Sequence, residues 1–139
     1  MQCDNGRLMA YFINPIEGEQ CLCVSCEGEI PLEDLAGVGW EAHGLLNIKR
    51  WFRMLIDITQ LRSSHKASQL IDFSKALAGK FPRNARVALV VRSDQTMQAN
   101  LFEKISRKHG MFLAYFLDPG KAALWIQRSS TPSRRKLDP

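Results

Sequence analysis

Apolar residues recur along the chain with two different spacings, and these spacings predict strands and helices in alternation. Short apolar segments rich in β-forming residues predict strands at 7–13, 20–27, 51–58, 85–92 and 111–117. Longer segments with apolar residues three or four positions apart predict helices at 28–46, 63–79, 93–110 and 118–127. Pro15 and Gly18 predict a turn between the first two strands, which are therefore expected to pair antiparallel.

The order of these elements predicts the fold class. Strands that alternate with helices form parallel β-α-β units with right-handed crossovers. We therefore expect an α/β domain with a mixed, mostly parallel five-stranded sheet and four helices. The domain is expected to span residues 1–127. The polar, basic segment 128–139 is expected to be a disordered tail, and its few cations are more typical of a solubilising tail than of a nucleic-acid site.

The side chains of each predicted strand divide into an apolar set and a mixed set. The apolar sets should meet in one core, and they are Leu22, Val24 and Cys26; Phe52, Met54, Ile56 and Ile58; Val87, Leu89 and Val91; and Phe112, Ala114 and Phe116.

The mixed sets predict a second sheet face that is partly open and that suits a subunit, a protein partner or an amphipathic anionic ligand. The alternative is that the last helix and the N-terminal strand cover this face and leave a small cleft. The residues expected on it are Trp51, Arg53, Leu55, Asp57, Arg86, Arg92, Leu113 and Tyr115.

Three of the four cysteines lie close together at Cys21, Cys23 and Cys26, which raises the question of a metal or redox centre. On a regular strand Cys21 and Cys23 share one face, about 6.6 Å apart, while Cys26 points to the other face. Thiolates on one zinc ion must lie within about 4 Å of each other. The spacing therefore favours packing in the sheet over metal binding, and no metal or cofactor is expected.

Charge is distributed unevenly within a net charge of +5. Residues 1–46 hold eight acids and one base, while the remaining residues hold 18 bases and six acids. Such a dipole can steer a partner, although ordinary solvated faces also explain it. Because no secretion or membrane-spanning segment is evident, a cytoplasmic protein with reduced thiols is expected.

Few side chains are arranged for catalysis. The sequence has no phosphate-binding glycine loop, no nucleophile elbow and no paired-carboxylate motif, and its three histidines are scattered. Asp57 lies late in a central strand, where α/β proteins often place chemistry, but alone it is expected to hydrogen-bond the following loop. We therefore expect no enzymatic activity.

Four segments in this order resemble the SpoIIAA-like group of STAS proteins: VSCEGEIPLEDL, MLIDITQL, ARVALVV and FLDPGKAALWI. The resemblance covers residues 7–127. It implies a β-α superhelix whose parallel strands are sequential neighbours, with the N-terminal strand antiparallel, related in shape to CRAL-TRIO lipid-transfer domains. It also implies a regulatory module that binds a protein partner or a second copy of itself.

The same resemblance points to Ser63 and Ser64 as possible phosphorylation sites. Anti-sigma-factor antagonists of the wider family carry Asp-Ser-Ser-Gly at the start of the second helix, and a serine there is phosphorylated. In this chain the Asp before and the Gly after the two serines are missing, so plain capping of the helix is the alternative. A carrier of a small hydrophobic ligand remains the alternative to the regulatory module.

Overall fold

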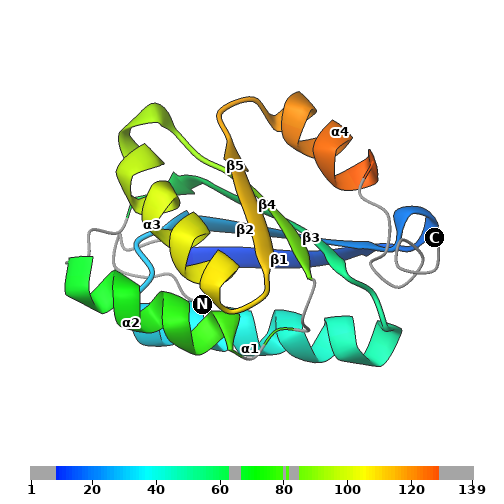
Figure 1. The fold of residues 1–139 in the computed structure, drawn as a ribbon, viewed down its shortest axis with the longest axis horizontal. Coiled ribbons are helices and arrows are strands. Elements are labelled where there is room, and N and C mark those ends of the chain that lie inside the picture. Colours follow the sequence, from blue (N-terminus) through cyan, green and yellow to red (C-terminus); the bar gives the residue numbers. More distant parts are fainter. Residues whose placement is uncertain (1–8, 63–66, 80, 82–84, 129–139) are drawn as a thin grey trace.

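The structure is a computed structural model, and it describes residues 9–62, 67–79, 81 and 85–128. Its elements alternate as the sequence predicts (Figure 1). In chain order they are β1 (Met9–Ile16), a 3-10 turn (Glu17–Glu19), β2 (Cys21–Gly28), α1 (Leu32–Lys49), β3 (Arg53–Leu61), α2 (Ala67–Ala78), β4 (Arg86–Val90), a second 3-10 turn (Ser93–Gln95), α3 (Thr96–Lys108), β5 (Phe112–Phe116) and α4 (Pro119–Arg128).

The five strands form one sheet in the order β1-β2-β3-β4-β5. β1 pairs antiparallel with β2, and the remaining neighbours pair in parallel. The predicted mixed, mostly parallel five-stranded sheet with four helices is confirmed. A helix connects the two strands of each parallel pair. Because the strand order is sequential, each of these connections leads to the next strand in the sheet.

The first hairpin differs from the prediction at its turn. β1 continues to Ile16 and includes Asn14 and Pro15, which were expected in the turn. Pro15 is compatible with a strand here because β1 is the edge of the sheet, where a missing backbone N–H need not break a ladder. The chain reverses at Glu17–Glu19, and Gln20 adopts a left-handed conformation with φ of 53°.

Two helix ends follow from local chemistry. Asp118 precedes α4, and its Oδ1 accepts a hydrogen bond of 2.8 Å from the backbone N–H of Gly120, as expected of a capping residue before Pro119. α1 runs three residues past its predicted end at 46. It ends where Arg50 adopts a left-handed φ of 60°, and the N–H of Trp51 bonds the carbonyl of Leu46 at 3.1 Å.

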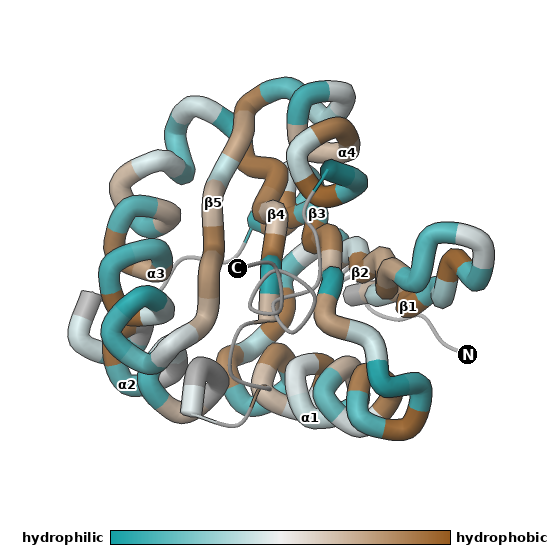
Figure 2. The backbone as a smooth tube through the Cα atoms, turned by 45° about the vertical axis from the view of Figure 1, so that its right-hand side comes forward, coloured by the Kyte–Doolittle hydropathy of each residue, from teal (hydrophilic) through white to brown (hydrophobic). Residues whose placement is uncertain are grey.

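The helices cover the two sheet faces unequally. We call the sheet face on the side of α1, α2 and α3 the first face. The larger core lies on this face, and Leu22, Met54 and Val87 are fully buried in it. α4 lies on the opposite side, which we call the second face (Figure 1). The hydropathy colouring in Figure 2 shows that β4 is apolar along most of its length, as expected for a strand covered on both faces.

The predicted facing of β5 is wrong. Leu113 lies beside Val87, and Tyr115 lies beside Leu89, so Leu113 and Tyr115 belong to the first face. Phe112, Ala114 and Phe116 therefore belong to the second face. Both sets of β5 side chains are apolar, so the sequence pattern does not show which set meets the main core.

Two other residues expected on the second face lie elsewhere. Trp51 precedes β3 instead of continuing its alternation, and it is buried in the first-face core with Lys49 Nζ 4.8 Å from its ring centroid. Arg92 follows the last residue of β4 and lies at the carboxyl edge of the sheet. Arg53, Leu55, Asp57 and Arg86 are on the second face as predicted.

Candidate functional site on the second sheet face

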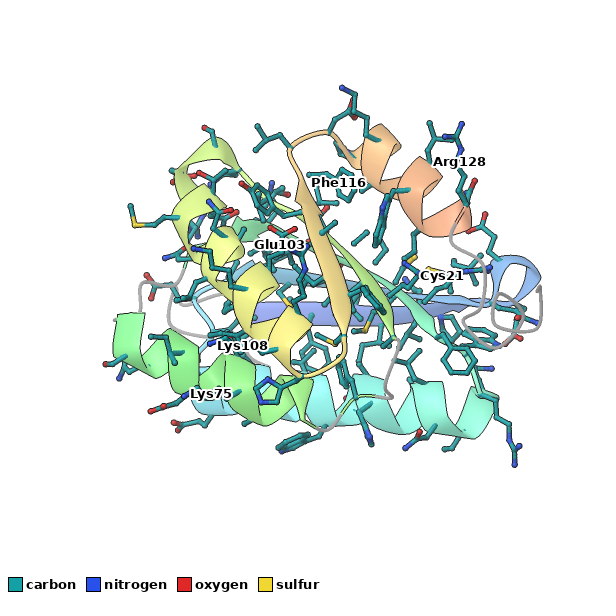
Figure 3. All side chains as sticks on the ribbon, in the orientation of Figure 1. Cys21, Lys75, Glu103, Lys108, Phe116 and Arg128 are labelled. Atoms are coloured by element: carbon teal, nitrogen blue, oxygen red, sulfur yellow. The ribbon has the colours of Figure 1, made fainter. Side chains whose placement is uncertain are left out.

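α4 covers the middle of the second face. Ala122 and Ile126 are buried there, and Leu55, Ala88 and Val90 lie in the same apolar cluster. Figure 3 shows Phe116 near the first turn of α4 and Cys21 near its last turn, so the helix runs diagonally across the strands. The alternative in which the last helix covers much of this face is therefore correct for its centre.

An uncovered strip remains beside β1. Phe12 and Ile16 are 50% and 37% exposed, and both lie on the second face because Phe12 pairs with Ser25 and Ile16 pairs with Cys21. Ser25 is in turn the neighbour of Asp57 on β3. We call the group Phe12, Asn14, Ile16, Ser25 and Asp57 the β1 strip.

The outer edge of β1 adds backbone groups to this strip. β1 has a neighbouring strand on one side alone within the described part of the chain, so its other edge presents backbone N–H and C=O groups to the surroundings. Such an edge is a template for pairing with an extended segment. Sequence reasoning missed Phe12 and Ile16, because the exposed part of this face depends on where α4 lies and because Ile16 was expected in a turn.

Asp57 acts in local structure, but it bonds Thr59 of its own strand and not the following loop that was expected, because β3 continues to Leu61. Its Oδ1 accepts hydrogen bonds of 2.8 Å from the backbone N–H and 2.7 Å from the hydroxyl of Thr59. The β2–β3 register shifts just beyond this point, between Ser25 and Glu27. Asp57 therefore fixes the irregular end of β3, and this use of its carboxylate satisfies it without a substrate.

Arg53 and Arg86 lie side by side at the amino end of the second face, but each is engaged by the protein itself. Arg53 Nη1 donates to the backbone carbonyl of Glu19 at 3.0 Å. The guanidinium carbon of Arg86 lies 5.0 Å from the ring centroid of Phe112. The pair therefore supports the hairpin and β5 more directly than it forms an anion site.

A polar network joins β3 and β4 at the carboxyl edge of the sheet. Arg92 Nη1 donates to the carbonyls of Thr59 and Leu61, and its Nε donates to Asp94 at 2.9 Å. Gln95 is buried and donates from Nε2 to the carbonyl of Ile58 at 2.9 Å. Arg92 thus orders the end of β3 instead of crossing an open sheet floor. Ser63 and Ser64, which follow this end, lie outside the described residues, so their modification stays a prediction.

The cysteines face the two sides of the sheet as predicted. Cys21 and Cys23 pack on the second face, whereas Cys26 is buried in the first-face core. A hydrogen bond from the Cys21 thiol lowers the pKa of Cys23 to about 7, while the same interaction and burial raise the pKa of Cys21. Burial, followed by the charge of Asp57, raises the pKa of Cys26 to about 11.

These values predict that Cys23 reacts first with iodoacetamide. Thiolate is the reactive form, and Cys23 is half-buried, so its alkylation rate should rise through pH 7 and level off by about pH 8. Below pH 7 the rate should fall about tenfold per pH unit, while Cys26 stays slow throughout. Mass-spectrometric peptide mapping separates the thiols. A Cys21→Ala variant, which has no side-chain donor, is the control, and an unchanged midpoint for Cys23 in it would contradict the assigned hydrogen bond.

Within the described ranges, no group of three or more His, Cys, Asp or Glu residues could hold a metal ion. His43 stacks on Phe81 with ring centroids 5.9 Å apart, and His109 Nδ1 lies 3.0 Å from the carbonyl of Ile105, so both contact neighbouring structure. In the same part of the chain, no helix is long and apolar enough to span a membrane.

Comparison with solved structures identifies the fold. An anti-sigma factor antagonist from Mycobacterium paratuberculosis matches with a TM-score of 0.60 and 13% identity, over 90% of this chain and 99% of that one. An uncharacterised protein of the DUF3478 family with a SpoIIAA-like fold, from Shewanella loihica PV-4, matches with a TM-score of 0.55 and 20% identity, over 91% and 99%. The chain therefore has a SpoIIAA-like fold. No family model and no curated protein matches the sequence.

Proposed function

We propose that the protein is a non-enzymatic, STAS-type regulatory module that binds an extended segment of a partner protein along the β1 strip. The observation that carries the proposal is the pair of exposed apolar side chains, Phe12 and Ile16, beside a strand edge with no neighbour in the described structure. An extended segment added to this edge gains main-chain hydrogen bonds, and the apolar side chains supply contact area.

Charge favours a particular kind of partner. The acids of residues 1–46 include Glu19 and Glu27 at the two ends of the β1–β2 hairpin, and both are exposed, whereas Glu17 is already paired with Lys49 Nζ at 2.7 Å. A second copy of the same edge would bring these acids near one another, whereas a basic partner segment would neutralise them. We therefore favour a partner segment that alternates apolar and basic residues over a homodimer.

The fold comparison supports a partner protein in general terms, because one similar structure is that of an anti-sigma factor antagonist. Absence of catalysis is part of the proposal. Asp57, the acid best placed for chemistry, is engaged by Thr59, and Arg53 and Arg86 contact their own chain. Cytoplasmic location, the extent of the domain over 1–127 and the tail at 128–139 also stay predictions.

The test places a photo-crosslinking amino acid at Asn14, which is exposed in the middle of the β1 strip. In the native host we expect one defined adduct with another protein. Phe12→Lys with Ile16→Lys should remove that adduct, because lysines on an edge strand oppose apolar and basic partners alike. Ile48→Lys is the matched control, since Ile48 is 78% exposed on α1.

Three results would contradict this proposal. The first is an adduct that persists in the double lysine variant. The second is loss of the adduct in Ile48→Lys as well, with the protein still folded. The third is self-crosslinked protein alone, which would make the strip a dimer interface.

A further inference from the structure

A cavity of about 160 Å³ lies inside the first-face core, on the side of the sheet opposite the β1 strip. The sheet contributes Leu89 and Leu113 to its walls, α1 contributes Val38 and Ala42, and α3 contributes Phe102. These residues come from the sheet and from two of the helices on its first face. The space therefore lies within the main core and is separate from the region beneath α4.

The size of the cavity is unusual for a core. Protein interiors pack as densely as organic crystals, and few voids exceed one water molecule. Because most of the lining is apolar, a space of this size accepts an apolar molecule about as large as benzene. When the cavity is empty, the atoms that line it lack dispersion contacts on one side. An occupant of matching shape would restore these contacts and stabilise the fold.

Four side chains with an amide or hydroxyl group line the cavity: Ser74 on α2, Gln95 just before α3, and Gln98 and Ser106 on α3. Gln98 and Ser106 both line the cavity, and neither side chain makes a hydrogen bond within the described part of the chain. Gln95 also lines it, but its amide already bonds the backbone of Ile58 and Arg92. Ser74 also interacts with the protein itself. Gln98 and Ser106 thus remain for a ligand in a wall that is otherwise mostly apolar.

The lining also limits the charge of the ligand. Among the described residues around the cavity, no side chain is charged. A carboxylate or ammonium group would lose its hydration without gaining an opposite charge. A hydroxyl or carbonyl group requires one or two hydrogen bonds, which an amide and a hydroxyl can supply.

We propose that this cavity binds a small, neutral, mostly apolar molecule that carries one hydroxyl or carbonyl group. The apolar body contacts Val38, Leu89 and Phe102, and the polar group bonds Gln98 or Ser106. This site differs in place and in ligand charge from the amphipathic anion considered for the second face. Ligand binding in the cavity does not depend on partner binding at the β1 strip, because the cavity and the strip lie on opposite faces of the sheet.

The test uses cyclohexanol as the probe and the full chain with methyl-labelled Leu and Val. We expect saturable binding with a Kd of about 1 mM or below. Methyl shifts should be largest at Val38, Leu89 and Leu113. Cyclohexanecarboxylate should bind at least tenfold more weakly, because its charge would be buried without a partner. Methylcyclohexane, which lacks the hydroxyl, should bind more weakly than cyclohexanol.

Two variants locate the site. Ala42→Leu fills the cavity and should weaken cyclohexanol binding at least tenfold, whereas Ala76→Leu, at an exposed position of α2, should not. Gln98→Leu should remove the preference for cyclohexanol over methylcyclohexane. If Ala42→Leu does not fold, Val38→Phe replaces it as the variant that fills the cavity. The comparison of the two ligands in Gln98→Leu requires no filling variant.

Absence of saturable binding by the wild-type chain would overturn the proposal. So would methyl shifts confined to the second face, or tighter binding of the carboxylate. Loss of partner crosslinking at Asn14 would not bear on it, and failure to bind cyclohexanol would not bear on the β1 strip.

Discussion

An Ile126→Ala variant is expected to lose about 2–4 kcal/mol of unfolding free energy, whereas Leu124→Ala should lose less than about 0.5 kcal/mol. Ile126 is 2% exposed and packs with Ala122 on the second face, while Leu124 on the same helix is 53% exposed. The two substitutions remove equally many carbon atoms and carry similar helix propensities. Their difference therefore reports the burial of α4 against the sheet.

Urea denaturation followed by circular dichroism measures both variants. The urea concentration at the unfolding midpoint should fall strongly for Ile126→Ala. The dependence of the unfolding free energy on urea should change little, because the surface exposed on unfolding stays nearly the same. Nearly equal losses for the two variants would mean that α4 does not cover the second face in solution. In that case the open surface would extend from the β1 strip across Leu55 to Phe116.

The fold was predictable because its signals are local and mutually consistent. Each strand carries apolar β-formers, each helix has a three-to-four-residue apolar spacing, and Asp118 with Pro119 marks the start of the last helix. Alternation of these elements restricts the topology to parallel crossovers. The sequential strand order came from the resemblance to SpoIIAA-like proteins, since periodicity alone does not specify which strands are neighbours.

The faces were harder to predict than the elements. Leu113 and Phe112 are both apolar, so period-two alternation on β5 permits either set to face the main core, and only the register with β4 decides. Trp51 shows a second limit. The prediction extended the regular alternation to the two residues before Arg53, where β3 begins. The chain has not yet entered the strand conformation at those residues, so the alternation does not hold there.

The candidate sites were predictable only in part. The second face was located correctly from Arg53, Leu55, Asp57 and Arg86, but its exposed portion depends on where α4 lies, which is a tertiary property. The first-face cavity depends on how side chains from α1, α3 and the sheet fill a shared volume. A sequence pattern gives the polarity of such residues and not the space left between them.

Gln95 is expected to be the most sensitive polar residue of the described core. It is 6% exposed, its Oε1 accepts from the backbone N–H of Arg92 at 2.8 Å, and its Nε2 donates to the carbonyls of Ile58 and Leu61. These groups lie where the β2–β3 register is irregular, so the side chain bonds backbone groups next to a gap in the regular ladder. The amide of Gln95 therefore joins the carboxyl ends of β3 and β4.

Gln95→Leu should lower the unfolding free energy by about 2–4 kcal/mol. Leucine has nearly the same volume but leaves the Ile58 carbonyl and the Arg92 N–H without this partner in a buried place, while Leu61 keeps its bond from Arg92 Nη1. Gln98→Leu is the control, one turn along on α3, because its amide makes no hydrogen bond within the described structure. Urea denaturation of both variants measures the difference. A loss for Gln95→Leu no larger than for Gln98→Leu would show that water replaces the amide, and that the ends of β3 and β4 are held by Arg92 alone.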